Sequence, residues 1–184
     1  MSVDFSDPPL APFVGRSLDG FALLDGDELR RNLTALARHH GGNKAELRRE
    51  ALTLIKTEFN SGREIVRKRV ESGVSPGLAA ARALSVLQDV VIQVLYDFAT
   101  RHMYYASNPT ESERLAVVAT GGYGRGLLAP GSDVDLLFLH PFKITPWAES
   151  VVEYILHTLW DLGLKVGHAT RSLNACVRLG KEDI

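Results

Sequence analysis

The sequence predicts an α+β protein in which a helical N-terminal region packs on a small core built around a mixed sheet. From about residue 27 to residue 108, apolar residues recur with the period of an α-helix. After residue 109 the pattern changes to short runs of β-branched residues, separated by glycine and proline turns. We therefore divide the chain into an irregular arm over residues 1–26, a helical region over residues 27–108 and a core over residues 109–184.

The helical region is expected to contain three helices, preceded by an arm whose prolines disfavour helix. The first helix begins at Asp25 or Asp27, because either side chain can cap its N-terminus. The second begins after Asn43, and Gly62 is a possible point of interruption. The third begins at Ser75-Pro76, where a capping residue precedes a proline.

The core is expected to alternate strands and helices. The apolar, β-branched run over residues 115–120 predicts a buried strand, and residues 134–140 and 164–173 predict two more. Gly121-Gly122 reads as a turn before a short helix over residues 123–128. A longer helix is expected to begin at Pro146 and end at Leu162, and the tail after residue 173 reads as a short helix.

Two aspartates at the start of the second expected strand are the strongest candidates for catalysis. Asp133 and Asp135 are two residues apart, so on a strand they point to the same face, while Val134 points into the core. Two adjacent carboxylates repel each other, and a bound divalent cation removes that cost. Oxygen ligands of this kind suit Mg²⁺ or Mn²⁺, so we expect both residues to bind the metal of a phosphoryl-transfer site.

The residues around this pair predict a nucleotide site. Gly121 and Gly122 have no Cβ atoms, so backbone N–H groups there can approach phosphate oxygens closely. They stand where a strand passes into a helix, and a helix N-terminus favours anions. Ser132 offers a hydroxyl, and Arg125 can face phosphate or pair with a carboxylate. A Gly-Gly pair or an Asp-x-Asp alone is usually a turn or a solvated strand end, but their combination in this order is far more specific.

His168 and Arg171, in the third expected strand, are weaker site candidates, because a single histidine in a strand is more often structural. The net charge of −1, from 21 basic and 22 acidic residues, gives no general reason to expect nucleic-acid binding. One cysteine, Cys176, excludes an internal disulfide. With no secretory signal and no long run of consecutive apolar residues, a cytoplasmic protein without membrane contact is expected.

A resemblance to a known family sharpens the functional expectation. Residues 121–126, Gly-Gly-Tyr-Gly-Arg-Gly, followed by residues 132–137, Ser-Asp-Val-Asp-Leu-Leu, resemble the signature of the bifunctional uridylyltransferase/uridylyl-removing enzymes. Leu87-Gln88-Asp89 and Val166-Gly167-His168 resemble further parts of that family, so the similarity extends from about residue 45 onward. The motif itself is typical of the wider polymerase-β-like nucleotidyltransferase superfamily.

The resemblance implies a reaction. UTP would be the donor and a tyrosine hydroxyl of the PII nitrogen-signalling protein the acceptor, with Mg²⁺ (or Mn²⁺) as cofactor and pyrophosphate as the second product. Members of the family also carry a hydrolase domain that removes UMP and domains that sense glutamine. We therefore expect this chain to be part of a longer protein, with its core truncated at the C-terminal side. A third carboxylate would then lie past Ile184, and residues 1–184 alone would be catalytically incomplete.

Two alternatives remain open from the sequence. One is another protein-modifying nucleotidyltransferase, such as the adenylyltransferase that acts on glutamine synthetase, because no residue pattern here identifies the base. The other is a regulatory nucleotide-binding module that keeps the motif without turnover.

Overall fold

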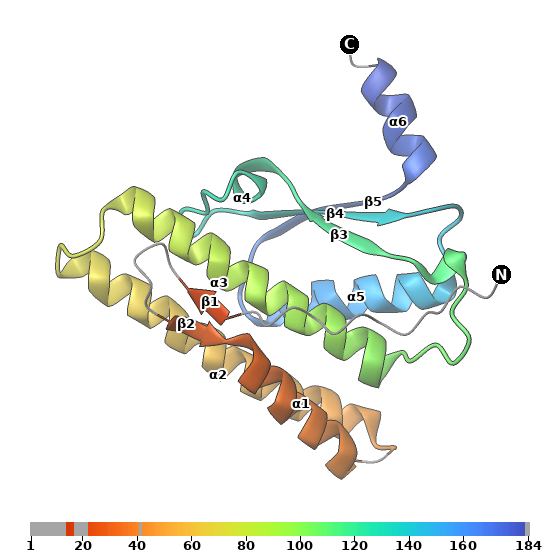
Figure 1. Ribbon diagram of the computed structural model, residues 1–184, viewed down its shortest axis with the longest axis horizontal. Helices are drawn as coiled ribbons and strands as arrows, with labels where there is room; N and C mark the ends of the chain where they lie inside the picture. Colours follow the sequence, from red (N-terminus) through yellow and green to blue (C-terminus); the bar gives the residue numbers. More distant parts are fainter. Residues whose placement is uncertain (1–13, 17–21, 41, 183–184) are drawn as a thin grey trace.

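The structure is a computed structural model that describes residues 14–16, 22–40 and 42–182. A helical layer beside a three-stranded sheet confirms the expected α+β class (Figure 1). Three long helices come first in the chain: α1 (Gly26–His40), α2 (Lys44–Glu71) and α3 (Gly77–Phe98). A π-helical turn, Ala99–Met103, continues α3, and a short 3-10 turn, Glu111–Glu113, leads to the sheet.

The segment before α1 corrects the expectation of an irregular arm. Strands β1 (Val14–Arg16) and β2 (Ala22–Asp25) form an antiparallel hairpin, while residues 1–13 and 17–21 lie outside the described residues. The hairpin packs on the long helices, with β1 against α3 and β2 against α2. Leu23 and Leu24 are both buried there. Burial of these two side chains favours the strand conformation. The apolar run over residues 22–24 is too short to predict that burial from the sequence.

Helix α2 runs without interruption through Gly62, contrary to the break considered from sequence. Asn43 caps it, as expected, by accepting a hydrogen bond from the backbone N–H of Glu46 at 3.2 Å. Gly62 is buried, and a Cβ atom there would lie 2.7 Å from Cδ1 of Leu87 and 3.0 Å from the carbonyl oxygen of Leu23. The glycine therefore permits close packing of α2, α3 and β2 rather than breaking the helix.

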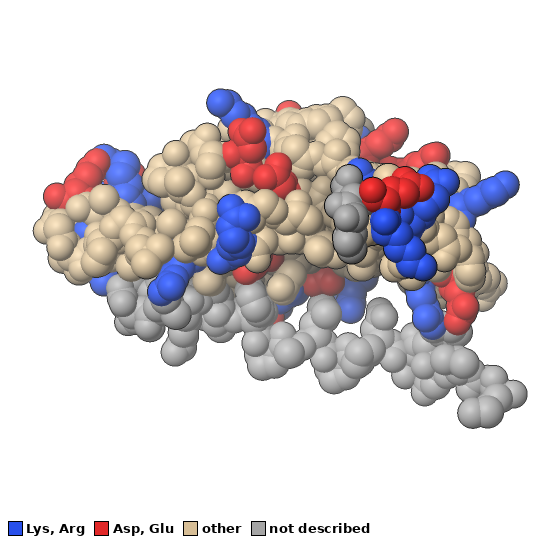
Figure 2. Space-filling view, turned by 90° about the horizontal axis from the view of Figure 1, so that it is seen from above, with Lys and Arg blue, Asp and Glu red and all other residues tan. Residues whose placement is uncertain are grey.

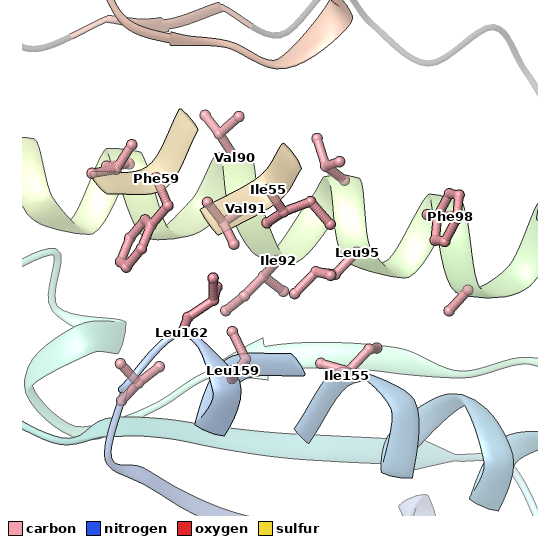
Figure 3. Packing of buried hydrophobic residues seen from close by; sticks show 14 of the residues in the cluster. Ile55, Phe59, Val90, Val91, Ile92, Leu95, Phe98, Ile155, Leu159 and Leu162 are labelled. Carbon is pink, nitrogen blue, oxygen red and sulfur yellow. The ribbon is translucent and has the colours of Figure 1, made fainter. Parts of the chain in front are cut away.

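Helix α3 is the central element of the core. Pro76, rather than Ser75, occupies its N-cap position. Its buried side chains lie between those of α2 and those of α5 (Pro146–Asp161), as Figure 3 shows for Val91, Ile92 and Leu95. Each fully buried aliphatic side chain of this kind contributes roughly 1.5–3 kcal/mol to folding, so the interface of α2, α3 and α5 is a main source of stability.

The apolar composition of α3 also meets the length and hydropathy of a membrane span. Gly77–Met103 has 27 residues, and an 18-residue stretch within it has a mean hydropathy of 1.5, although the sequence has no comparably long run of consecutive apolar residues. About half of this 18-residue stretch is buried within the protein. A core helix surrounded by other elements needs such a composition, so packing accounts for it.

The sheet is mixed and has the order β3-β4-β5. β3 (Ala116–Ala119) is antiparallel to β4 (Val134–His140), and β5 (Val166–Ser172) is parallel to β4. Helix α4 (Gly121–Gly124) follows β3, and α5 connects β4 to β5. Thr145 and Pro146 begin α5, with the Thr145 hydroxyl accepting from the backbone N–H of Ala148 at 3.2 Å. These elements match the expected order of strands and helices.

The two faces of the sheet differ. Figure 1 shows α3 and α5 on the same side of it, and the β4 residues that point to that side are buried: Val134, Leu136, Phe138 and His140. Asp135, Leu137 and Leu139 point to the other face and are half-buried. No β3 residue is buried, and Val118 is 37% exposed, so the expectation of a buried strand there is wrong. β3 lies at a sheet edge, which leaves its apolar side chains only partly covered by the described residues.

Helix α6 (Leu173–Glu182) extends away from the rest of the molecule (Figure 1). None of its residues is buried, and its apolar Leu173 and Val177 are more than half exposed. Across the face shown in Figure 2, Lys and Arg side chains are interspersed with Asp and Glu, in keeping with the near-neutral net charge.

Candidate active site

The two candidate aspartates lie at the start of the central strand. Asp133 directly precedes β4 and is exposed, and Asp135 is its second residue and is half-buried. The backbone around them is held from both neighbouring strands. Val134 N–H donates to the carbonyl of Lys165 at 2.8 Å, and the carbonyl of Asp135 accepts from Thr120 N–H at 3.0 Å. The alternation of β4 directs both carboxylates to the face away from α3 and α5.

Neither carboxylate has a cationic partner among the residues that the structure describes. Among the described residues, no side chain or backbone donor is hydrogen-bonded to either carboxylate group, and no cation forms an ion pair with them. The described part of the chain also brings no third Asp, Glu, His or Cys together with them in a metal-ligand cluster. Two unpaired carboxylates at one strand end fit a divalent cation, which prefers oxygen ligands.

Gly121 brings the end of β3 directly against Asp135. It has a positive φ of 59°, a conformation that glycine adopts without strain, and a Cβ atom there would overlap Oδ2 of Asp135. Sequence reasoning assigned Gly121 to phosphate approach. The structure places it beside the carboxylate, where its missing side chain makes room for the candidate metal ligand.

Helix α4 differs from the expectation, which was a turn at Gly121-Gly122 followed by a helix over residues 123–128. It spans only four residues, beginning at Gly121, and Gly124 N–H donates to the carbonyl of Thr120 at 2.7 Å. Gly124 itself has no room for a side chain, because a Cβ atom would lie 2.6 Å from the carbonyl oxygen of Ala119. A helix this short has little macrodipole. Any phosphate contact there would therefore depend on individual N–H groups rather than on a helix field.

A tyrosine that sequence reasoning did not single out anchors this segment. Tyr123 is 3% exposed, and its hydroxyl donates to Oδ1 of Asp89 on α3 at 2.6 Å. Burial raises the pKa of the half-buried Asp89 carboxyl, and the hydrogen bond from Tyr123 partly offsets that shift. Burial and the nearby carboxylate also raise the pKa of the Tyr123 hydroxyl above its usual value. In the sequence, the only sign of this role is that Tyr123 is an aromatic residue between glycines. It belongs to no periodic apolar pattern that would predict its burial.

The loop between α4 and β4 is also attached to α3. Leu128 N–H donates to the hydroxyl of Ser85 at 3.0 Å. In the same loop, the Ser132 hydroxyl donates to the carbonyl of Ala129 at 2.8 Å. Its hydrogen is therefore engaged in a local turn, and Ser132 could donate to a phosphate only by giving up that bond. Arg125 is exposed, and its guanidinium lies near Gly122, 3.9 Å from the position a Cβ atom would take there.

The two weaker candidates on β5, His168 and Arg171, point to opposite faces of the sheet. In the parallel pairing, His168 is matched with Leu136 and Arg171 with Leu139. His168 therefore points to the α5 side, where its ring lies 6.2 Å from that of Trp160, and not toward the aspartates. Arg171 is on the same face as Asp135 but four residues further along the sheet, roughly 13 Å at the usual strand rise.

Comparisons with known proteins show what kind of domain surrounds these residues. A family model described as "Nucleotidyltransferase domain" matches residues 108–179. Three similar relatives, each described as a bifunctional uridylyltransferase/uridylyl-removing enzyme, come from Caulobacter vibrioides, Phenylobacterium zucineum and a Bradyrhizobium species. The Caulobacter relative is 55% identical over 161 residues and the Phenylobacterium relative 52% over 161, each match covering 88% of this chain and 17% of the relative. The Bradyrhizobium relative is 43% identical over 166 residues, which cover 90% of this chain and 18% of the relative.

The chain thus spans about a sixth of the length of these curated relatives. No solved structure matches it. The identities confirm the resemblance that the glycine and aspartate motifs suggested. The chain therefore contains a nucleotidyltransferase domain, and over about nine-tenths of its length it is homologous to part of the enzymes named bifunctional uridylyltransferase/uridylyl-removing enzyme.

Proposed function

We propose that this chain supplies the nucleotide-transfer site of an enzyme that moves UMP from UTP to a tyrosine hydroxyl of a PII-type signalling protein. The observation that carries the proposal is the pair of unpaired carboxylates, Asp133 and Asp135, on one face of β4 beside the glycine junction of β3 and α4. This arrangement lies inside the nucleotidyltransferase domain of a chain whose relatives are named uridylyltransferases. The acceptor protein and a cytoplasmic location are parts of the same proposal.

The reaction forms a bond between the tyrosine oxygen and the α-phosphorus of UTP and breaks the bond to the bridging oxygen, so that pyrophosphate leaves. A tyrosine hydroxyl has a pKa of about 10 and is a poor nucleophile at neutral pH. Mg²⁺ or Mn²⁺ bound at the two aspartates would favour loss of the hydroxyl proton and offset charge on the phosphates.

The protein's own residues would bind and orient the donor. Asp133 and Asp135 hold the cation, and the rigid attachment of α4 to α3 through Tyr123 keeps the glycine junction in place beside them. Gly122 leaves its backbone open to a phosphate, and the exposed guanidinium of Arg125 nearby can balance phosphate charge. Ser132 is a further candidate phosphate contact, on the loop that leads to Asp133.

The choice of UTP is supported by the names of the relatives, which also disfavour the adenylyltransferase alternative. A thermal-shift comparison of UTP, ATP, CTP and GTP, each with Mg²⁺, tests the base. We expect the largest stabilisation with UTP. A larger effect of ATP would support the adenylyltransferase, and binding without transfer in the assay below would support the non-catalytic module.

Replacing one carboxylate tests the transfer site. In the full-length product of the gene, Asp135→Asn should reduce Mg²⁺-dependent transfer of labelled UMP to a PII-type protein by at least about a hundredfold, since the variant cannot hold the cation. Asp161→Asn, at an exposed aspartate that ends α5, is the matched control and should be fully active. Undiminished transfer by Asp135→Asn would refute the proposed role of the pair.

A further inference from the structure

We propose that Gly167, on β5, is a positioning residue for the Asp135 carboxylate, so that a strand without any candidate metal ligand determines the geometry of the metal site. This inference rests on the proposed function, because it assumes that Asp135 binds the cation. It extends that function to a residue that contributes no ligand, no charge and no side chain.

The Asp135 carboxylate lies between two glycines on neighbouring segments. On the β3 side, Oδ2 occupies the space where a Cβ atom of Gly121 would be. On the β5 side, Gly167 is the residue matched with Asp135 in the parallel pairing, and a Cβ atom there would lie 2.5 Å from Oδ1 and 3.6 Å from Cγ. Real Cβ atoms do not approach other atoms as closely as 2.5 Å. The carboxylate therefore lies low over the sheet, in a recess that both glycines create.

The backbone gives no other reason for glycine at this position. Gly167 is not among the glycines of the described residues that have a positive φ, whereas Gly121 is. Any amino acid could adopt its conformation, and glycine inside a strand is unfavourable in itself because it packs nothing and loses more conformational freedom on folding. Space for the carboxylate of Asp135 is the one requirement visible at Gly167.

A methyl group at Gly167 would leave Asp135 no equivalent position. The side chain cannot shift toward β3, since that recess is already filled by its own Oδ2. It must rotate away from the sheet, or β5 must move away from β4. Either change displaces the carboxylate relative to Asp133, and a binding site for Mg²⁺ tolerates little displacement because the ion demands near-ideal geometry.

The direct test measures binding of Mn²⁺ in the presence of UTP, by electron paramagnetic resonance of the free ion, in the full-length product of the gene. Gly167→Ala should weaken Mn²⁺ binding at least tenfold. Ala169→Ser, which adds one atom at the next residue on the same face of β5, is the matched control and should bind Mn²⁺ as the wild type does. Wild-type affinity in Gly167→Ala would overturn the inference.

A thermal-unfolding cycle with Asp135→Ala tests the same contact without using metal or activity. In the wild-type background, Gly167→Ala should lower Tm; if Asp135 rotates freely, it should instead leave Tm unchanged and weaken only Mn²⁺ binding. In the Asp135→Ala background, where the carboxylate is absent, Gly167→Ala should not lower Tm. If Gly167→Ala destabilises or unfolds both backgrounds equally, the glycine serves another purpose and the inference is wrong. A wild-type enzyme that binds Mn²⁺ and UTP but transfers nothing would instead refute the proposed function and leave this contact standing.

Discussion

The hydrogen bond between Tyr123 and Asp89 gives a quantitative test of how the site is held. Tyr123→Phe removes only the hydroxyl that donates to Oδ1 of Asp89 at 2.6 Å. A hydrogen bond to a charged group contributes about 1.5–3 kcal/mol. Because Asp89 is only half-buried, water can partly replace the donor, so we expect a loss near the lower limit, about 1.5 kcal/mol. At about 2–4 °C per kcal/mol for a chain of this size, Tm should fall by roughly 3–6 °C.

Urea unfolding at neutral and acidic pH measures this loss and its pH dependence. The bond stabilises the ionised carboxylate and lowers the pKa of Asp89 relative to its value in the variant. Its contribution is therefore present above the pKa of that carboxyl and is lost as the pH falls through it. Tyr105→Phe, at a side chain that is 73% exposed, is the control and should unfold as the wild type does. A loss below about 0.5 kcal/mol, the range of ordinary surface substitutions, would show that the hydroxyl does not anchor α4.

Three further substitutions or conditions have definite expected outcomes. Gly122→Ala should weaken UTP binding without lowering Tm, because a Cβ atom there meets its nearest atom, a backbone carbonyl oxygen, at an ordinary 3.5 Å; equal UTP titrations of variant and wild type would contradict this. Burial raises the pKa of Tyr154 to about 12, so the free energy of unfolding should be unaffected below about pH 10, the unfolded value, and fall as the pH rises from there toward 12. Urea unfolding across that range, compared with Tyr154→Phe, checks it, and equal curves would refute it. Alanine at Arg67, Lys68 and Arg69 together should leave UTP affinity unchanged in a titration, since Arg67 is paired on the exposed face of α2 with glutamates of its own helix; a large loss would place nucleotide or partner there.

Much of this fold could be predicted from the sequence, because it depends on interactions between residues close together in the chain. Asn43 and Pro146 mark helix starts by capping and by a fixed φ, and both helices begin where these residues indicate. The alternation around Val134 placed Asp133 and Asp135 on one face for the same reason, because strand periodicity is a property of the chain itself. Order and type of the core elements followed from such short-range rules.

The features that sequence reasoning missed depend on contacts between distant segments. The hairpin of β1 and β2 packs on helices that come later in the chain. The exposure of Val118 likewise depends on which segments cover the sheet. From the sequence, Gly62 was a possible point of interruption in the helix. In the structure, Leu87 lies so close to it that a residue with a Cβ atom would not fit. For His168, a weaker site candidate, the sequence could not show the side of the sheet to which it points, because the pairing register that directs it toward Trp160 depends on β4.

Helix α6 has a consequence for the kinetics of amide hydrogen exchange. Isolated helices shorter than about 12–15 residues are only marginally stable in water, and α6 has ten residues, none of them buried. Within the described part of the chain its packing is limited to contacts with the adjacent strand β5, whereas α3 has buried residues along its whole length. Amides of α6 should therefore exchange with solvent through local fraying, orders of magnitude faster than those of α3, which open only when the core itself unfolds. Slow exchange in α6 would reveal that another surface covers Leu173 and Val177 in solution.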